Sequence, residues 1–332
     1  MKALFIGGTG IISSACVQLA LERGYELYIL NRGQTTKRSI PAGARLLQAD
    51  IRDRASVQSA LGDLKFDVVV NWVAFTPEHI ETDLALFRDR TAQYIFISSA
   101  SAYQTPPARL PVTESTPLDN PVWSYSQNKI ACEDRLIAAY RAEKFPATIV
   151  RPSHTYDQTL LPMEGGYTVI DRMRHGQPVI VHGDGTSLWT LTHHRDFAKG
   201  FVGLMGNPFT LGEAFHITGD EVLSWNQIFT IVAHAAGVKP HLVHVPSELI
   251  AAYDRGWGDG LLGDKAHSMI FDNTKIKRLV PDFVATIPFA QGAREIMAWY
   301  DADPARRVIN ADFNTTVDRI LAAYRSAWPT TA

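Results

Sequence analysis

The chain has 332 residues, of which 46% are hydrophobic, 20% charged and 10% aromatic, so it can bury a large core and is neither disordered nor a coiled coil. Its 32 basic and 34 acidic side chains give a formal net charge of −2, which offers no positive surface for nucleic acid or anionic membrane. No apolar run approaches the length of a membrane span, and the N-terminus reaches glycine after Ile6, too early for a signal-peptide core. The two cysteines, Cys16 and Cys132, exclude a disulfide framework or a zinc cluster. We expect a soluble, cytoplasmic protein of about two domains.

The first half of the chain alternates short apolar runs with amphipathic stretches. The apolar runs predict buried strands over residues 3–6, 26–30, 45–48, 68–72, 94–98 and 148–150. The amphipathic stretches predict helices over residues 13–23, 56–61, 80–90 and 125–142. Strands that alternate with helices in this way are typical of a parallel sheet with both faces covered. The pattern predicts an α/β fold, a Rossmann-type doubly wound parallel sheet.

After residue 155 the alternation gives way to loops rich in glycine and bulky residues, such as 161–166 and 257–260. This change predicts a smaller C-terminal lobe that completes a cleft and binds substrate. We expect residues 194–219 to return to the main sheet. The predicted dinucleotide-binding domain therefore comprises residues 1–155 and 194–219, and the predicted substrate lobe comprises residues 156–193 and 220–332.

A glycine-rich turn joins the first predicted strand to the first predicted helix. Gly7 and Gly10 would let the backbone approach a pyrophosphate, whose charge the N–H groups at the helix N-terminus would stabilise. Ser13 stands where the third glycine of the usual dinucleotide fingerprint falls, and its small side chain still permits close packing. An ordinary strand-to-helix turn is the alternative, but the place of this turn on the first βα unit favours a dinucleotide site. Its expected residues are Gly7, Thr9, Gly10, Ile11 and Ile12.

The end of the second predicted strand indicates which dinucleotide binds. NAD-binding proteins of this architecture usually have an acidic residue there, which holds the ribose 2′-hydroxyl. Here Asn31 and Arg32 follow the strand, so no carboxylate would repel a 2′-phosphate and Arg32 could grip one. We therefore favour NADP(H), with NAD(H) possible; a solvated loop is the alternative. Nearby cations are Lys37 and Arg38, and further cofactor contacts are expected from Asp50, Ile51, Val73, Ala74 and Phe75.

A tyrosine and a lysine, Tyr125 and Lys129, lie one turn apart on the same face of a predicted helix. A free phenol titrates near pH 10, and an ammonium within about 4–5 Å would lower its pKa by roughly two units. Tyr125 could then act as acid and base while Lys129 binds the nicotinamide ribose. Upstream, residues 95–101 run off a buried strand into small hydroxyl residues, and such a hydroxyl can polarise a substrate carbonyl. A solvated helix face is the alternative for the Tyr/Lys pair alone.

Together these motifs resemble those of an extended short-chain dehydrogenase/reductase of the NAD-dependent epimerase/dehydratase type. The resemblance rests on residues 7–12, 98–103, 125–129 and 151–156, and it extends to residues 182–186 and 195–198. In that family the catalytic serine or threonine lies three residues before an Ala-Tyr pair, which implies Ser99 as the third catalytic residue. The resemblance also implies hydride exchange with the nicotinamide ring, Pro152 and His154 beside that ring, and often a homodimer built through the Tyr/Lys helix.

Two departures from the family pattern narrow the expected chemistry. Sugar-nucleotide dehydratases of this kind carry an Asp-Glu pair after the catalytic threonine, where this chain has Ala100 and Ser101, so dehydration is disfavoured. Relatives that act on nucleotide sugars usually have an arginine after the Gly-Asp-Gly-Thr turn, where this chain has Trp189. An indole suits stacking on a sugar or another apolar group better than binding a diphosphate. We therefore assign Ser101 and Trp189 to the substrate and expect nucleoside diphosphates to bind poorly.

Other conspicuous residues receive structural interpretations. His193 and His194 resemble a metal pair, but adjacent histidines on a strand point to opposite faces, so no metal site is predicted. Cys132 is expected in the core or an interface. Three aromatic side chains are expected to pack in the core, namely Trp225, Phe229 and Trp299.

The sequence thus predicts an NADP-preferring oxidoreductase that exchanges hydride with a secondary alcohol or ketone of a carbohydrate-like small molecule. One alternative is an epimerase that retains its cofactor and uses the same Ser/Tyr/Lys site. A non-enzyme alternative is a redox-sensing or RNA-associated member of the same fold, against which the Ser/Tyr/Lys set and the net charge of −2 argue. We expect a small-molecule substrate and a homodimer, with no nucleic acid or membrane partner.

Overall fold

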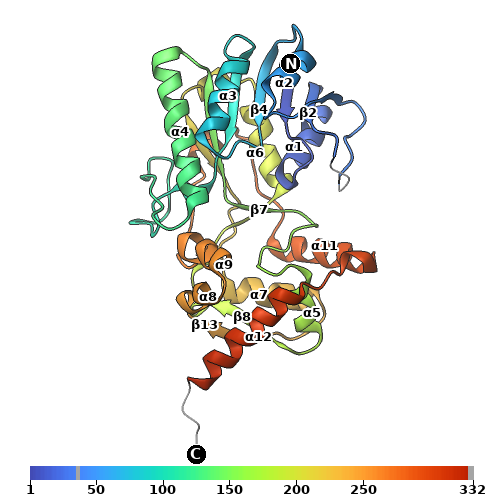
Figure 1. Ribbon diagram of the computed structural model, residues 1–332, viewed down its shortest axis with the longest axis vertical. Coiled ribbons are helices and arrows are strands. Elements are labelled where there is room, and N and C mark those ends of the chain that lie inside the picture. The colour runs from blue at the N-terminus through green and yellow to red at the C-terminus, as the bar shows by residue number, and fades with distance from the viewer. Residues whose placement is uncertain (35–37, 328–332) are drawn as a thin grey trace, which may run out of the picture.

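A seven-stranded parallel sheet forms the upper part of the protein in Figure 1, a computed structural model that describes residues 1–34 and 38–327. The strands follow the order β11-β6-β5-β4-β1-β2-β3, and each neighbouring pair is parallel. The chain order reverses between β1 and β4, and sheets of this kind bind ligands in the crevice at the carboxyl ends of such strands. The strands are β1 (Lys2–Ile6), β2 (Glu26–Asn31), β3 (Arg45–Gln48), β4 (Phe66–Asn71), β5 (Thr91–Ile97), β6 (Ala147–Pro152) and β11 (Ala214–Ile217).

Helices cover both faces of the sheet because successive strand side chains point to opposite sides. In β1, Ala3 and Phe5 join a buried cluster with Phe201 of α6, whereas Leu4 and Ile6 join a separate cluster on the other face. The first face is covered by α1 (Ile11–Glu22), α6 (His194–Leu204) and α10 (Thr274–Leu279); the second is covered by α2 (Arg54–Leu61), α3 (Pro77–Phe87) and α4 (Ser124–Glu143). This arrangement confirms the predicted Rossmann-type α/β fold.

Every strand and helix predicted within the first 155 residues is present, with ends that differ by a few residues. The helix predicted over residues 80–90, for example, is α3 and begins earlier, with Pro77 in its first turn. In α2, Asp53 accepts hydrogen bonds from the N–H groups of Ala55 and Ser56, so the helix begins at Arg54. The ends shift because capping groups, and not the spacing of apolar residues, set where a helix begins.

The remaining chain forms a second lobe with its own core, in the lower part of Figure 1. Three small sheets hold it together, in which β7 pairs with β10, β9 with β12, and β8 with β13. No helix within residues 1–34 and 38–327 is long and apolar enough to cross a bilayer. The strands are β7 (His154–Tyr156), β8 (Pro178–His182), β9 (Leu188–Trp189), β10 (Leu191–His193), β12 (Leu223–Ser224) and β13 (His241–Val245). The other helices are α5 (Tyr167–Arg174), α7 (Trp225–Ala235), α8 (Ser247–Tyr253), α9 (Arg255–Gly260), α11 (Phe289–Asp301) and α12 (Ala311–Ser326), with short helical turns η1 (Ala100–Ala102), η2 (Pro208–Thr210), η3 (Leu261–Lys265) and η4 (Pro304–Arg306).

Candidate active site

The glycine loop lies between the carboxyl end of β1 and the N-terminus of α1, beside the crevice of the sheet. Gly7 has a φ of +95°, and a Cβ there would lie 2.9 Å from Cγ1 of Val73, so only glycine fits this turn. Gly10 caps α1 without a side chain, and the first turn of the helix carries no acidic residue. The N–H groups of that turn therefore meet no competing carboxylate. These residues fit the pyrophosphate of a dinucleotide.

Arg38 connects the glycine loop to the second lobe. Its Nη1 donates to the backbone oxygen of Thr9 at 3.4 Å, and its Nη2 donates to Oδ2 of Asp157 and to Oγ1 of Thr159, each at 2.5 Å. Arg38 was expected only as a cation of this loop. Its partner Asp157 lies 119 positions further along the chain, and the neighbouring residues of Arg38 do not indicate it. Lys37, the other cation named in this loop, lies outside the described residues. Arg38 places a guanidinium beside the expected pyrophosphate site.

At the adenosine end of the expected cofactor site, the predicted cofactor residue Asp50 places its carboxylate beside Arg32. Nη1 of Arg32 lies 4.0 Å from Oδ2 of Asp50, and both side chains are exposed. The expectation that no carboxylate faces a 2′-phosphate is therefore wrong, because β2 and β3 pair and bring their ends together. Asn31 accepts a hydrogen bond from the N–H of Gly33 and stabilises the same turn. Ile51, the other cofactor contact predicted here, is buried.

The loop after β4 is held from two sides. Arg52 donates to the backbone oxygen of Val73, and Nζ of Lys129 donates to the backbone oxygen of Ala74 at 2.7 Å. Nδ1 of His79 accepts hydrogen bonds from the N–H of Phe75 and of Thr76, at 3.0 and 3.3 Å. Ala74 is fully buried, whereas Phe75 is 43% exposed at the crevice end of the sheet. These hydrogen bonds fix the loop to the sheet and to α4.

Two of the three predicted catalytic residues, Ser99 and Tyr125, and both predicted substrate residues line one cavity of about 260 Å³ between the two lobes. Ser99 follows the end of β5, and its Oγ lies 2.8 Å from Oγ of Ser101. Tyr125 lies in the first turn of α4. Asp264 and Phe271 are wall residues that no sequence motif indicated, because η3 and the chain after it reach the cavity only through the folding of the second lobe. The walls are Ser99, Ala100, Ser101, Trp123, Tyr125, Pro152, Ser153, His154, Trp189, Thr190, Asp264, Lys265 and Phe271.

The electrostatics of Tyr125 differ from the expectation. Burial raises the pKa of Tyr125 above its ordinary value; a hydrogen bond with Ser99 partly offsets this rise, and Asp264 adds to it. The expected lowering of this pKa by Lys129 is therefore wrong. The ammonium of Lys129 instead donates to the backbone oxygens of Ala74 and Ile97, at 2.7 Å each, and lies 5.7 Å from the ring centroid of Tyr125. Tyr125 is thus a protonated phenol at neutral pH.

Lys129 is 2% exposed and does not line the cavity. Burial lowers the pKa of its ammonium to about 8. The rings of Phe75 and Phe96 lie 4.7 and 4.8 Å from Nζ, close enough for cation–π contact. Lys129 therefore connects the loop after β4, the end of β5 and α4, which carries Tyr125.

The cavity wall contributed by the second lobe is largely neutral. Burial lowers the pKa of His154 to about 3, so its imidazole is uncharged at neutral pH. Trp189 is only 4% exposed, and its ring centroid lies 5.7 Å from that of Trp225. Nζ of Lys265 lies 3.7 Å from Oδ2 of Asp264, and burial raises the pKa of that carboxyl to about 6. The stacking role assigned to Trp189 stays a prediction, with little of its surface open to a ligand.

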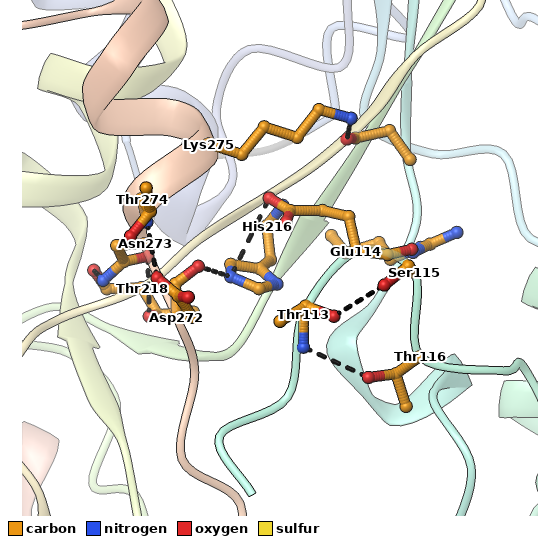
Figure 2. A network of polar contacts seen from close by, with 12 residues as sticks. Thr113, Glu114, Ser115, Thr116, His216, Thr218, Asp272, Asn273, Thr274 and Lys275 are labelled. Carbon is orange, nitrogen blue, oxygen red and sulfur yellow. Dashed lines mark hydrogen bonds and ion pairs between the residues drawn. The ribbon is translucent and has the colours of Figure 1, made fainter. Parts of the chain in front are cut away.

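A network of polar contacts fixes the chain that carries Phe271 (Figure 2). His216 on β11 lies with Nε2 2.8 Å from the backbone oxygen of Asp272 and with Nδ1 3.0 Å from the hydroxyl of Tyr103. Because a carbonyl only accepts, Nε2 carries the hydrogen and Nδ1 accepts from Tyr103. Glu114, on the loop before α4, accepts a hydrogen bond from the N–H of His216. The network joins both lobes at the edge of the cavity.

The two adjacent histidines do not share a strand. His193 ends β10 and accepts a hydrogen bond from the N–H of Arg195 as the cap of α6, while His194 is the first residue of that helix. Nε2 of His193 lies 3.0 Å from Glu295, and Nδ1 of His194 lies 3.1 Å from the backbone oxygen of Ile11. The assumption of opposite strand faces is thus wrong, although both side chains have structural partners. No group of three or more metal-ligating side chains gathers within residues 1–34 and 38–327.

Comparison with known proteins places these features in a family. Residues 3–217 match the NAD dependent epimerase/dehydratase family. The chain is 30% identical over 168 residues to a UDP-glucose 4-epimerase of Lactobacillus helveticus, a match that covers 46% of this chain and 51% of that protein. It is 26% identical over 257 residues to the chloroplast stem-loop binding protein of 41 kDa b of Arabidopsis thaliana, covering 73% of this chain and 65% of that protein. The chain thus spans only about half to two thirds of the length of these relatives.

A third relative and a solved structure match over more of their length. The chain is 24% identical over 291 residues to 2′-dehydrokanamycin reductase of Streptomyces kanamyceticus, covering 85% of this chain and 80% of that protein. The structure of dTDP-glucose 4,6-dehydratase from Bacillus anthracis, in complex with NAD, superposes with a TM-score of 0.73 at 18% identity, covering 92% of this chain and 98% of that one. That likeness shows a shared fold. Because the family match covers residues 3–217 of 332, the chain belongs to the NAD dependent epimerase/dehydratase family, as its motifs predicted.

Proposed function

We propose that the protein is an NAD(P)-dependent oxidoreductase that reduces a ketone on a carbohydrate-like small molecule to a secondary alcohol. The observation that carries this proposal is the shared cavity of Ser99 and Tyr125, with Lys129 one turn further along α4 and bound to the strand end that precedes Ser99. A bound nicotinamide would supply the hydride. Tyr125 would give its hydroxyl proton to the carbonyl oxygen, and Ser99 would donate a hydrogen bond to the same oxygen.

The protonation state of Tyr125 supports the reductive direction. Burial raises the pKa of this phenol, so at neutral pH it holds the proton that ketone reduction consumes. Alcohol oxidation would instead require a phenolate, which this environment disfavours. The relative named as a reductase of 2′-dehydrokanamycin supports the same direction. Lys129 would bind the ribose hydroxyls beside the nicotinamide with its ammonium.

The choice between NAD(H) and NADP(H) depends on Arg32 and Asp50. Arg32 alone would favour a 2′-phosphate, which was the basis for expecting NADP(H). The carboxylate of Asp50, 4.0 Å from the guanidinium, would repel a 2′-phosphate and accept hydrogen bonds from ribose hydroxyls. The family and the NAD-containing neighbour support NAD(H). We propose that NAD(H) is accepted and that this pair of side chains sets any preference.

We propose an uncharged substrate and no dehydration. Ala100 and Ser101 stand where dehydratases of this type have acidic residues, so the cavity wall after Ser99 lacks a carboxylate to remove a proton. In the second lobe, the Arg172 guanidinium is bound to Pro178, Asn314 and Asp318, which leaves it unavailable to a diphosphate.

The direct test follows oxidation of NADH and NADPH in the presence of a panel of uncharged keto sugars and of nucleotide sugars. The proposal expects stoichiometric oxidation of NADH with at least one uncharged keto sugar, and none with the Tyr125→Phe variant. A cofactor-retaining epimerase would interconvert sugars with no net change in NADH. Interconversion without consumption of NADH would therefore replace our proposal with the epimerase alternative.

A nucleic-acid role is the second candidate, because one relative is named as a stem-loop binding protein. The formal net charge of −2 counts against it. RNA retention that weakens steeply with salt would support it.

The homodimer through α4 and the cytoplasmic location are likewise proposals, the first of which sedimentation velocity tests directly.

A further inference from the structure

A second cavity of about 490 Å³ lies in the second lobe, next to the cavity of Ser99 and Tyr125. The two cavities share Trp123, His154 and Lys265 as wall residues. A volume of this size lies within the range, roughly 300–1,000 Å³, that binds small organic ligands. The two cavities are therefore adjacent and border the same three side chains.

Apolar side chains make up most of the wall of the second cavity, and six of them are aromatic. Trp225 and Phe229 come from α7, Trp257 from α9, Tyr300 from α11 and Phe313 from α12. The rings of Trp257 and Phe313 lie 5.3 Å apart between centroids. Aromatic walls of this kind provide large apolar contact area for a flat ring.

The two cationic side chains at the second cavity, Arg172 and Lys265, have partners within the protein, and the exposed Glu164 adds a carboxylate to the wall. Arg172 is 3% exposed and its three guanidinium nitrogens donate to Pro178, Asn314 and Asp318. Nζ of Lys265 donates to the backbone oxygen of Gly260 at 3.3 Å and lies near Asp264. Burial lowers the pKa of His182 to about 4, as it lowers that of His154, so neither imidazole adds charge at neutral pH. A diphosphate would leave its two or so charges poorly compensated here.

We propose that this cavity binds an uncharged aromatic group attached to the substrate, so that the substrate is an aryl-bearing keto sugar and not a nucleotide sugar. This inference rests on the proposed reductase function, because it places the reacting carbonyl at Ser99 and Tyr125. The aromatic side chains would contact the ring. Trp123 and Lys265, which line both cavities, would contact the bond between the ring and the sugar.

The test measures binding of 2-naphthol, an uncharged aryl probe without sugar, by isothermal titration calorimetry. Gly260 lines the cavity with a helical φ of −69°, and a Cβ there would meet only Nζ of Lys265, at 3.6 Å. Gly260→Leu would therefore fill the cavity without backbone strain, and Gly260→Ala is the matched control. We expect a dissociation constant below about 0.1 mM for wild type and Gly260→Ala. Binding should weaken at least tenfold in Gly260→Leu.

Three results would overturn the proposal: no binding to the wild type, equal binding to Gly260→Leu, or low-micromolar binding of UDP that Gly260→Leu abolishes. If Gly260→Leu fails to fold, Gly256→Leu replaces it, since a Cβ at this other wall position meets only Asp254, at 3.5 Å. Tyr125→Phe should bind 2-naphthol as the wild type does. The cavity proposal can therefore fail while Tyr125 remains essential for turnover, and the reductase proposal can fail while 2-naphthol still binds.

Discussion

The sheet lobe and the second lobe build their sides of the active site in different ways. In the sheet lobe, Gly7 and Ser99 follow the carboxyl ends of parallel strands and Asn31 is the last residue of β2, so these residues meet at one edge of the sheet. In the second lobe, the wall residues Trp189 and Phe271 lie far apart in the chain and meet through small sheets and loops. Because different segments build the two sides, we expect substitutions among the second-lobe wall residues to leave the dinucleotide-binding loops of the sheet in place.

The two lobes also differ in how far water reaches the ion pair of a buried arginine. Arg151, on β6 beneath the cavity, pairs with Glu133 of α4, and both side chains are almost fully buried, at 5% and 0% exposed. Ser98 also donates to Glu133, at 2.5 Å. In the second lobe, Arg172 is buried, but its partner Asp318 is 63% exposed. The sheet lobe therefore depends on a desolvated ion pair, whereas the second lobe depends on one that water can replace.

The largest expected effect is on turnover. Of the two tyrosines in α4, Tyr125 should be needed for it and Tyr140 should not. Tyr125→Phe removes the proton donor and should lower kcat by roughly 10²–10⁴-fold, with cofactor affinity nearly unchanged. Tyr140→Phe, the same substitution on the exposed side of α4, is the control and should change little. Steady-state kinetics with a keto sugar measures both. Near-normal turnover in Tyr125→Phe would remove α4 from the catalytic unit.

The next effect compares the two ion pairs by stability. Glu133→Gln leaves the Arg151 guanidinium buried without a counter-charge and should lower the free energy of unfolding by about 3–5 kcal/mol. Asp318→Asn, the matched change in the second lobe, should cost about 1 kcal/mol or less because the carboxylate that it removes faces water. Urea denaturation measures both variants. Similar losses in the two variants would contradict the contrast between the lobes.

The third effect is confined to the sheet lobe and concerns cofactor choice. Asp50→Asn removes the repulsion of a 2′-phosphate and should shift the NADPH-to-NADH affinity ratio about tenfold, or 1.4 kcal/mol, toward NADPH. Arg32→Ala should shift it by a similar factor toward NADH. Fluorescence titration of both nucleotides gives the ratios. Unchanged 2-naphthol binding would show that the variants are folded. If the NADPH-to-NADH affinity ratio then stays the same in both variants, the adenosine ribose does not bind beside Arg32 and Asp50.

The smallest expected effect is a pH dependence that belongs to Lys129. Its folded pKa of about 8 lies below the ordinary lysine value, so its positive charge is present below pH 8 and lost as the pH rises through 8. Loss of the charge-assisted hydrogen bond to ribose should weaken NADH binding roughly three- to tenfold between pH 7 and 9. Lys129→Met should bind weakly at both pH values, without that change. A pH-independent affinity in the wild type would contradict the ribose role.

Several site features could be predicted because they depend on local spacing. Tyr125 and Lys129 share a helix face by their four-residue separation, and Gly7 must be glycine wherever this tight strand-to-helix turn forms. The contacts of these side chains could not be predicted. The backbone oxygens that hold Lys129 belong to Ala74 and Ile97, on two other strand ends. They reach Lys129 only when the sheet has formed.

By itself, the sequence determined the alternation of strands and helices, the glycine turn and the order of the catalytic motifs, because apolar periodicity and turn chemistry act over a few residues. Tertiary structure alone decided that Asp50 faces Arg32, that burial raises the pKa of Tyr125, and that aromatic side chains from four helices enclose the second cavity. These properties depend on distance and desolvation between segments remote in the chain. The spacing of residues along the chain therefore predicts neither the distance between such segments nor their desolvation.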